Sequence, residues 1–125
     1  MKHLLDVNVL LPAIIKTHVH HTRTLAWLKD KEIVLCPLSE LGFIRIGSHK
    51  KAFGFPMAGV RQSLEQFAKE RKAVRIPDDL PALASHPQTS SQVTDHYLAD
   101  LASHHGLKLA TFDVQLQHPS VELIS

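Results

Sequence analysis

Apolar and polar positions divide the chain into two alternating kinds of segment. Short, uninterrupted apolar runs are typical of strands buried on both faces of a sheet, and we predict five of them, at residues 3–6, 33–36, 73–76, 107–111 and 121–124. Longer segments carry apolar residues at helical spacing, and we predict five helices, at residues 8–15, 17–31, 37–47, 57–71 and 93–105. Strands separated by helices indicate an α/β fold, with a parallel sheet and helices on both of its faces.

Proline and glycine mark the limits of these elements. Pro37 suits the first position of a helix, and Gly106 suits the end of the last helix. Residues 81–91 contain two prolines and several serines, which predicts a loop with one short helical turn. The pattern contains no repeat or linker, so we predict one domain over residues 1–125.

The composition is that of an ordinary globular domain. The chain has 125 residues, 44% apolar and 21% charged, which is enough for a core without a disulfide or structural metal. Its one cysteine, Cys36, lies in an apolar run, which predicts a buried, unreactive thiol and a reducing compartment. No segment is long and apolar enough to cross a membrane, and the first residues resemble neither a signal nor a transit peptide. We therefore expect a cytoplasmic protein without a membrane partner.

Four acidic residues lie where the predicted sheet presents its carboxyl ends. Asp6 closes the first strand, and Asp113 follows the fourth. Glu40 and Asp95 fall in the first turns of the helices that begin at 37 and 93. Each acid has an ordinary explanation, because helix starts favour acids and turns after strands favour aspartate. Ligands of open parallel sheets bind beyond the carboxyl ends of the strands, so we predict that the four carboxylates meet at one edge.

Such a group of carboxylates indicates metal chemistry. The charges repel one another unless cations are present, and oxygen ligands suit Mg²⁺ or Mn²⁺, which can promote phosphodiester cleavage. Asp95 lies on the border of the apolar face of its helix, whereas Asp100 is placed near the solvent side. We therefore predict Asp95 as a site residue and Asp100 as a solvated surface charge. Asn8 can cap the following helix or hold Asp6 through a hydrogen bond.

These acids stand in stretches that resemble the PIN domain, and most of all the VapC-type toxins of bacterial toxin–antitoxin pairs. The stretches are LLDVNVLL at 4–11, CPLSELGFIR at 36–45, TDHYLADLA at 94–102 and LATFD at 109–113. One stretch alone would be a weak signal. Together they cover nearly the whole chain, in the order and at the spacing of that family.

The resemblance implies an α/β/α sandwich around a central parallel sheet of about five strands. It also implies a Mg²⁺- or Mn²⁺-dependent endoribonuclease with an RNA substrate, a cognate VapB-like antitoxin that occupies the active-site groove, and often a homodimer. The acidic positions of the family correspond to four residues of this chain, Asp6, Glu40, Asp95 and Asp113. Asp6 and Asp95 are the expected metal ligands, with the other two acting directly or through water. The supporting positions correspond to Asn8 and Thr111.

The chain departs from the family after its fourth acid. Residues 114–116 are Val-Gln-Leu, where many relatives have further charges, so the role of Asp113 stays open between a direct ligand, a water-mediated one and a dispensable residue. Arg45 has two interpretations: it could contact phosphate from the rim of the groove, or it could be a solvated helix residue.

Basic and aromatic residues also allow a contact with RNA. The net charge of +2 is too small to indicate nucleic-acid binding by itself. The basic run at 49–51 stands beside Phe53 and Phe55, and such neighbours suit RNA. In VapC-like proteins this region often shapes the dimer or the antitoxin contact instead, which favours packing of the two rings.

Two further groups are expected to be structural. His18, His20 and His21 resemble a metal-binding tract, but no acid or cysteine stands at a matching spacing, so we expect them to begin the second helix. Asp78 and Asp79 stand between prolines, which predicts a simple turn.

Three other functions compete with a ribonuclease. A haloacid-dehalogenase-like phosphatase is similar in its Asp-x-Asp-x motif after the first strand, but its second aspartate is Asn8 here, and the chain lacks room for a cap domain. A receiver domain needs paired acids near the first strand and a lysine after the last, and neither is present. A PIN-type scaffold could bind RNA or a partner without cleaving, although the four intact acids argue against it.

Overall fold

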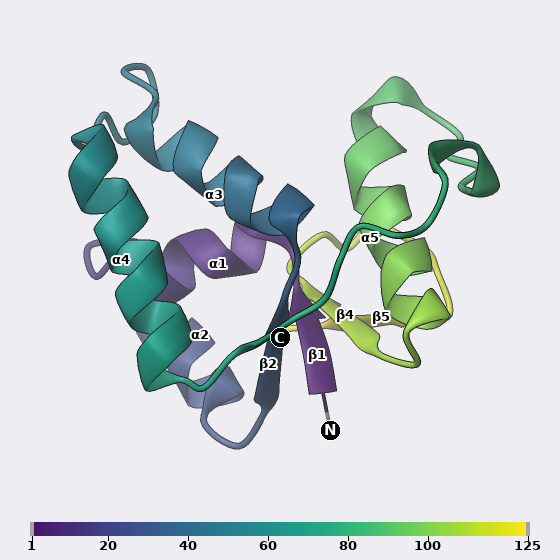
Figure 1. Cartoon of the computed structure of the whole chain (residues 1–125), viewed down its shortest axis with the longest axis horizontal. Coiled ribbons are helices and arrows are strands. Elements are labelled where there is room, and N and C mark those ends of the chain that lie inside the picture. The colour runs from purple at the N-terminus through teal and green to yellow at the C-terminus, as the bar shows by residue number, and fades with distance from the viewer. Residues whose placement is uncertain (1, 125) are drawn as a thin grey trace.

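The computed structural model describes residues 2–124 (Figure 1). The strands, in chain order, are β1 (Lys2–Leu5), β2 (Glu32–Leu35), β3 (Val74–Arg75), β4 (Lys108–Thr111) and β5 (Val121–Leu123). The helices are α1 (Val7–Ile14), α2 (His21–Leu28), α3 (Pro37–Ser48), α4 (Met57–Glu70) and α5 (Val93–His104). Single 3₁₀ turns lie at Ala82–Ala84 and Ser90–Gln92.

The five strands form one parallel sheet in the order β3-β2-β1-β4-β5, which confirms the predicted fold class. Leu4 of the central strand pairs with Val34 of β2 and with Leu109 of β4. The chain builds outward from β1 to β3 and then adds β4 and β5 on the other side of β1. This reversal makes a switch point between β1 and β4, where open parallel sheets bind ligands.

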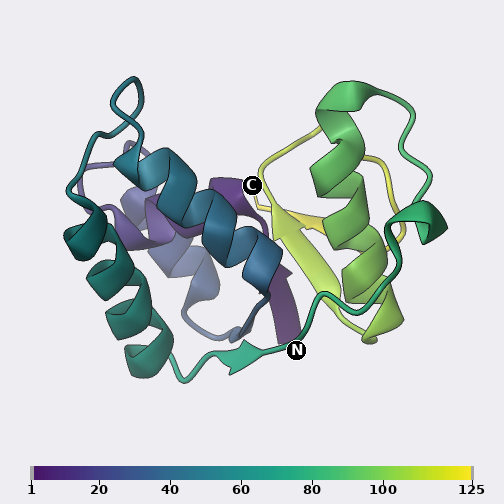
Figure 2. The same cartoon turned by 45° about the horizontal axis from the view of Figure 1, so that its top comes forward.

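Helices cover the two faces of the sheet unequally (Figures 1 and 2). Helices α1 to α4 lie on one face, where Phe43 and Val60 share a core with Leu5 of β1. The other face is covered by α5, whose Leu98 packs in a second core with Leu4. Successive residues of β1 point into opposite layers, as strand geometry requires.

Local signals fix where the helices begin and end. Asp6 is extended, and its Oδ1 accepts the N–H of Val7 at 2.7 Å, which caps α1. Pro37 takes the first position of α3. Gly106 follows α5 with a φ of +69°, which favours glycine and ends the helix.

Two predicted elements are shorter than expected. The helix predicted at 17–31 begins only at His21. His18 Nδ1 accepts the N–H of His20 at 3.0 Å, and such a local side-chain bond competes with a helix. Strand β3 has two residues, both exposed at the edge of the sheet.

The structure agrees with what composition indicated for Cys36. Its side chain is fully buried, and burial raises the pKa of the thiol to about 11, which makes it unreactive. Among residues 2–124, no helix is long and apolar enough to span a membrane.

Candidate active site

Asp6 is buried at the junction of β1 and α1, with 1% of its surface exposed. Its Oδ1 accepts the N–H of Val7 at 2.7 Å, and its Oδ2 accepts the hydroxyl of Thr111 at 2.9 Å. Burial and then the charge of Asp95 raise the pKa of Asp6 from 3.8 to about 6. Asp6 therefore caps a helix and is also a carboxylate that is costly to ionise.

Asn8 and Thr111 form a hydrogen-bonded bridge between α1 and β4. Asn8 Nδ2 donates to Thr111 Oγ1 at 3.1 Å, and Asn8 Oδ1 accepts the N–H of Phe112 at 3.2 Å. The N–H of Asp113 donates to the same Thr111 Oγ1 at 3.1 Å. Asn8 thus supports Asp6 through Thr111, and the bridge fixes Asp6 relative to Asp113.

Asp95 and Asp113 belong to the same electrostatic group as Asp6. Asp95 lies partly buried in the first turn of α5, where burial and then the charge of Asp113 raise its pKa. The charge of Asp113 also acts to raise the pKa of Asp6. Asp113 Oδ1 accepts the N–H of Gln115 at 2.9 Å in a tight turn. The structure therefore places three of the four predicted acids within electrostatic range at the switch point, although their ligand atoms do not all lie within 4.8 Å of one another.

Glu40 lies on α3, and its side chain forms an ion pair with Arg75. Its Oε1 accepts from Arg75 Nε at 2.7 Å, and the two side chains are 20% and 54% exposed. Arg75 ends β3, at the edge of the sheet. Glu40 is thus paired with Arg75, which lies outside the stretch 36–45 that contains Glu40.

A groove of about 780 Å³ lies between α3 and the start of α5. Arg45 and His49 of the α3 side and Asp95 of α5 line it. An apolar cavity of about 400 Å³, lined in part by Phe43 and Val60, contains none of the four acids. Arg45, for which a phosphate contact and a solvated position were both open, therefore shares a groove with one of the candidate metal ligands.

Phe112, next to Asp113, is the first of five aromatic rings in a row, in which the His18–His20 pair is tilted and the other three neighbouring pairs are stacked. Neighbouring ring centroids are 5.5, 5.7, 6.2 and 5.9 Å apart, in the order Phe112, His20, His18, Phe53 and Phe55. The row joins the loops that follow β4, α1 and α3. Phe53 and Phe55 thus pack on each other, as expected, while His18 and His20 precede α2 instead of beginning it.

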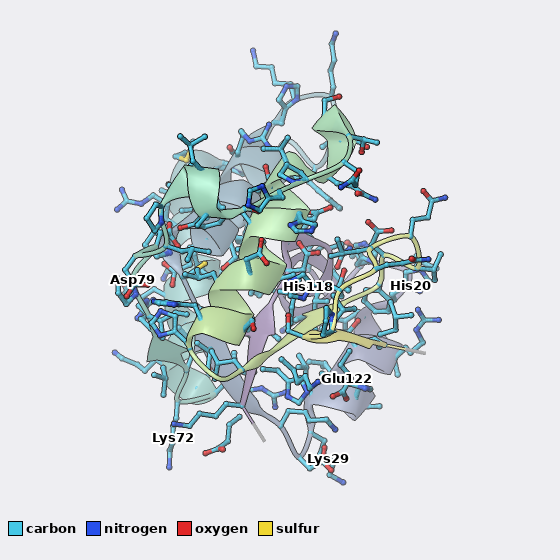
Figure 3. All side chains as sticks on the ribbon, turned by 90° about the vertical axis from the view of Figure 1, so that its right-hand side faces the viewer. His20, Lys29, Lys72, Asp79, His118 and Glu122 are labelled. Atoms are coloured by element: carbon cyan, nitrogen blue, oxygen red, sulfur yellow. The ribbon has the colours of Figure 1, made fainter. Side chains whose placement is uncertain are left out.

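Asp100 is not the solvated surface charge that helical periodicity predicted. It is 23% exposed, and its two oxygens bond to His96 Nδ1 at 3.0 Å and to His118 Nε2 at 2.7 Å. Burial acts to raise the pKa of Asp100, but hydrogen bonds from Ser85 and His118 outweigh it and lower that pKa. Loops carrying Ser85 and His118 cover this side of α5, which the periodicity of one helix does not reveal; Figure 3 shows His118 beside α5.

Asp78 and Asp79 do not form the predicted turn, because residues 77–79 lie in an irregular connection, and both aspartates make structural contacts. Asp78 Oδ2 accepts the N–H of Leu38 at 3.0 Å, at the start of α3. Asp79 Oδ1 pairs with His105 Nε2 at 2.8 Å, at the end of α5. The two aspartates therefore tie the connection between β3 and α5 to two different helices.

Comparison with known proteins identifies the family. A model of the PIN domain matches residues 3–121. Ribonuclease VapC38 of Mycobacterium tuberculosis is 31% identical over 123 residues, which cover 88% of this chain and 84% of the relative. Ribonuclease VapC39 of the same organism is 30% identical over 128 residues, which cover 93% and 91%. These matches overturn the phosphatase and receiver-domain alternatives.

Two solved structures have the same fold. VapBC2 from Rickettsia felis, bound to a DNA fragment from its promoter, matches with a TM-score of 0.66 and 16% identity over 98% of this chain and 97% of that one. FitAB bound to IR36 DNA matches with a TM-score of 0.62 and 23% identity over 98% and 94%. The sequence matches and the shared fold lead to one conclusion: the chain belongs to the PIN-domain family, among the VapC ribonucleases.

Proposed function

We propose that the protein is a Mg²⁺- or Mn²⁺-dependent endoribonuclease and the toxin of a VapBC-type pair. Its relatives at about 30% identity are named ribonucleases. The observation that carries the proposal is the group of Asp6, Asp95 and Asp113 at the switch point between β1 and β4. Beside the effect of burial, the charges of Asp95 and Asp113 raise the pKa of Asp6, and the charge of Asp113 raises that of Asp95.

The chemistry of these acids fits a hard divalent cation. Burial and like charges oppose ionisation of Asp6, and a bound cation would offset both. The donors are carboxylate oxygens, which Mg²⁺ and Mn²⁺ prefer. We assign Asp6 and Asp95 as ligands, with Glu40 and Asp113 acting directly or through water.

When bound, such an ion would supply activation of water and stabilisation of the departing oxygen of the phosphodiester. The residues of the chain position that chemistry. Thr111 directs one oxygen of Asp6 through its hydroxyl, and Asn8 holds Thr111 in place. Glu40 either leaves Arg75 and binds the cation directly, or keeps its ion pair with Arg75 and contacts the cation through a water.

We propose that RNA enters the groove between α3 and the start of α5. Arg45 lines this groove and offers donors that suit a phosphate. The stretch 41–64, part of which lines the α3 side of the groove, contains no Asp or Glu and four Lys or Arg residues, of which Arg45 lines the groove. A substrate backbone would therefore meet positive charge beside the carboxylates.

The same proposal includes a VapB-like antitoxin and a second copy of the chain as partners. VapBC2, which shares the fold, is a VapB–VapC pair bound to DNA from its promoter. This supports the proposal that the present protein pairs with an antitoxin. We further propose action in the cytoplasm. The sheet, which joins strands from both ends of the described chain, supports one domain over residues 1–125.

Cleavage of total RNA by purified, antitoxin-free protein tests the proposal. The reactions contain Mg²⁺ or Mn²⁺, or excess chelator, and compare the wild type with Asp6→Asn. Asp30→Asn is the matched control, because Asp30 is exposed and pairs with Lys31. We expect discrete fragments from the wild type and from Asp30→Asn with metal, and none from Asp6→Asn.

Each other result contradicts part of the proposal. Fragments in chelator would exclude a metal requirement. Full activity in a folded Asp6→Asn protein would exclude the assigned site. No cleavage by wild-type protein that binds Mn²⁺ would favour a PIN-type scaffold that binds without cleaving.

A further inference from the structure

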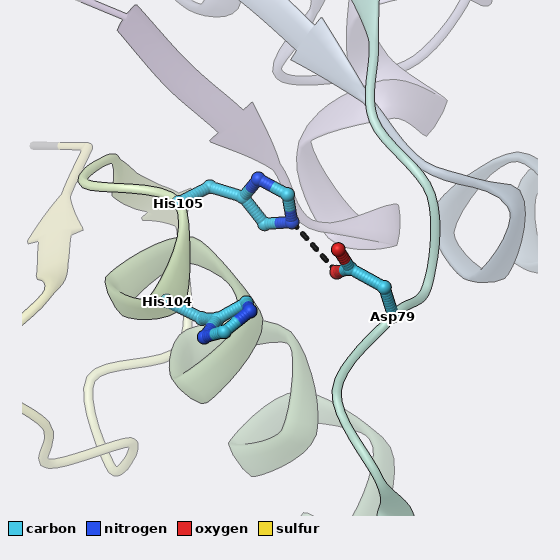
Figure 4. A group of neighbouring side chains, drawn as sticks. All are labelled: Asp79, His104 and His105. Atoms are coloured by element: carbon cyan, nitrogen blue, oxygen red, sulfur yellow. Dashed lines mark hydrogen bonds and ion pairs between the residues drawn. The ribbon is translucent and has the colours of Figure 1, made fainter.

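Three side chains of metal-binding type meet at the end of α5 that lies away from Asp95. His104 is the last residue of α5 and His105 its C-cap, and Asp79 reaches them from the connection after β3 (Figure 4). One ligand atom from each lies within 4.8 Å of the other two, and no other three His, Cys, Asp or Glu side chains do so within residues 2–124. The imidazole centroids are 5.3 Å apart, edge to face.

The three ligands suit a transition metal better than Mg²⁺. Two imidazoles and a carboxylate are a common ligand set for Zn²⁺, which takes N and O ligands at about 2.0–2.2 Å in a tetrahedron. Neighbouring ligand atoms of such a site lie roughly 3.4 Å apart. The pair of His105 and Asp79, at 2.8 Å, would open slightly, and His104 would move in from a distance of no more than 4.8 Å. Asp79 and His104 are exposed and can rotate to make these shifts. A water would complete the tetrahedron.

The end of the helix also favours a cation. The last carbonyls of a helix give its C-terminus a partial negative charge. His105 is held there, because its N–H bonds to the carbonyls of Leu101 and Ala102, both at 3.1 Å. Its Nε2 is already aimed at Asp79 Oδ1, 2.8 Å away.

We propose that Asp79, His104 and His105 bind Zn²⁺ or a similar transition-metal ion, which clamps the connection after β3 onto α5. This site is distinct from the carboxylates that we assign to catalysis. His104 stands nine residues after Asp95, or ~14 Å along the helix at 1.5 Å per residue. The proposal does not depend on the proposed ribonuclease activity.

The clamp would add an anchor to a connection that buried Ser85 also ties to α5, since its hydroxyl lies 3.1 Å from His96 Nδ1. Besides the Asp79 contact, the hydroxyl of Tyr97 donates to the carbonyl of Leu80 at 2.7 Å, and Asp78 accepts from the start of α3. Beyond these, Leu83 is 91% exposed. A metal bonded to Asp79 on the connection and to His104 and His105 at the end of α5 would replace the single hydrogen bond that now joins the two.

Calorimetric titration of metal-free, full-length protein with Zn²⁺ tests the site, in excess Mg²⁺ to occupy the carboxylates. Titration with Co²⁺ adds a readout, because its visible absorption reports on ligand geometry. We compare the wild type with His104→Ala and Asp79→Asn. His86→Ala is the matched control, since His86 is exposed on the same connection, and His20→Ala tests the histidines before α2.

We expect one equivalent of Zn²⁺ and a visible Co²⁺ spectrum. Affinity should fall at least tenfold in His104→Ala and Asp79→Asn and stay unchanged in the two other variants. Zn²⁺ should raise the Tm of the wild type but not that of His104→Ala. Equal affinity in His104→Ala and wild type, a loss confined to His20→Ala, or no binding at all would each overturn the site.

Discussion

At the residue scale, Asp6 combines two opposed properties. A carboxylate that caps a helix normally stabilises it. Asp6 is nevertheless almost fully buried and faces the charges of Asp95 and Asp113, and the bonds from Thr111 and Val7 offset this only in part. In the absence of cations, ionised Asp6 therefore lowers the stability of the protein that it helps to fold.

We expect Asp6→Asn to raise the free energy of unfolding of the metal-free protein at pH 7. Asparagine keeps an oxygen for the cap but carries no charge. The pKa moves from 3.8 to about 6, which corresponds to a gain of up to about 3 kcal/mol, at about 1.4 kcal/mol per unit. Urea unfolding in chelator measures it, with the exposed Asp30→Asn as control. A destabilised Asp6→Asn protein would contradict the electrostatic explanation.

The raised pKa also predicts a pH dependence. Between pH values of about 4 and about 6, the folded protein keeps a proton on Asp6 that the unfolded chain has released. The folded state then binds more protons, so this group's contribution falls as pH rises and is fully lost above the folded pKa. The difference in stability between Asp6→Asn and wild type should therefore grow across this window. A difference that is constant with pH would refute the assignment to Asp6.

Arg75 provides a prediction about metal affinity. Its guanidinium occupies Glu40 and adds positive charge near the proposed cation site. Arg75→Gln should lower the Mn²⁺ concentration for half-maximal cleavage by roughly two- to fivefold, since such an exposed pair contributes up to about 1 kcal/mol. Arg61→Gln on α4 is the control. An unchanged Mn²⁺ concentration for half-maximal cleavage would show that Glu40 does not contribute to metal binding.

The position of a site residue was predictable where that residue lies at the end of a strand. Asp6 and Asp113 flank strands, so a parallel sheet had to bring them to one edge. The partner of Glu40 was not predictable, because Arg75 is 35 positions away and meets it only once β3 has paired. Asp100 was mispredicted for a similar reason, since its partner His118 comes from a distant loop.

At the element scale, α3 approaches α1 closely at one glycine. A Cβ added to Gly42 would lie 2.5 Å from Val7 Cγ2, and Val7 is the residue whose N–H Asp6 caps. The β-branched side chain of Val7 has few ways to yield. The contact between these two helices thus positions the start of α1 beside the acids.

We expect Gly42→Ala to be less stable than Gly59→Ala by about 1–3 kcal/mol, the usual cost of overpacking. Both glycines lie in helices, but a Cβ at Gly59 would meet nothing within 4 Å. Thermal unfolding of the two variants gives the comparison, and RNA cleavage should fall only in Gly42→Ala. Equal stability of the pair would show that α3 can move away from α1 without cost.

Elements were predictable where periodicity is long. Helix α4 and helix α5 were located to within a residue or two, because buried positions recur every three or four residues. The start of α2 was misplaced, since the bond from His18 to the backbone of His20 is not visible in an apolar pattern.

At the scale of the whole molecule, the alternation of strands and helices was enough to predict the fold. It predicted a parallel sheet, and the rule for ligand position then located the carboxyl edge. It did not predict how unequally the faces are covered. Four helices on one side and α5 on the other follow from connection geometry, which periodicity does not contain.

That unequal cover makes one face of the sheet depend mainly on α5. Opening of α5 would expose one face of the sheet, while the four-helix side could keep its own core. Amide protons of α5 should then exchange with deuterium before those of α1, and the same opening would carry Asp95 away from Asp6. Opening of α5 would thus separate the acidic residues and expose the sheet to proteases in the same event.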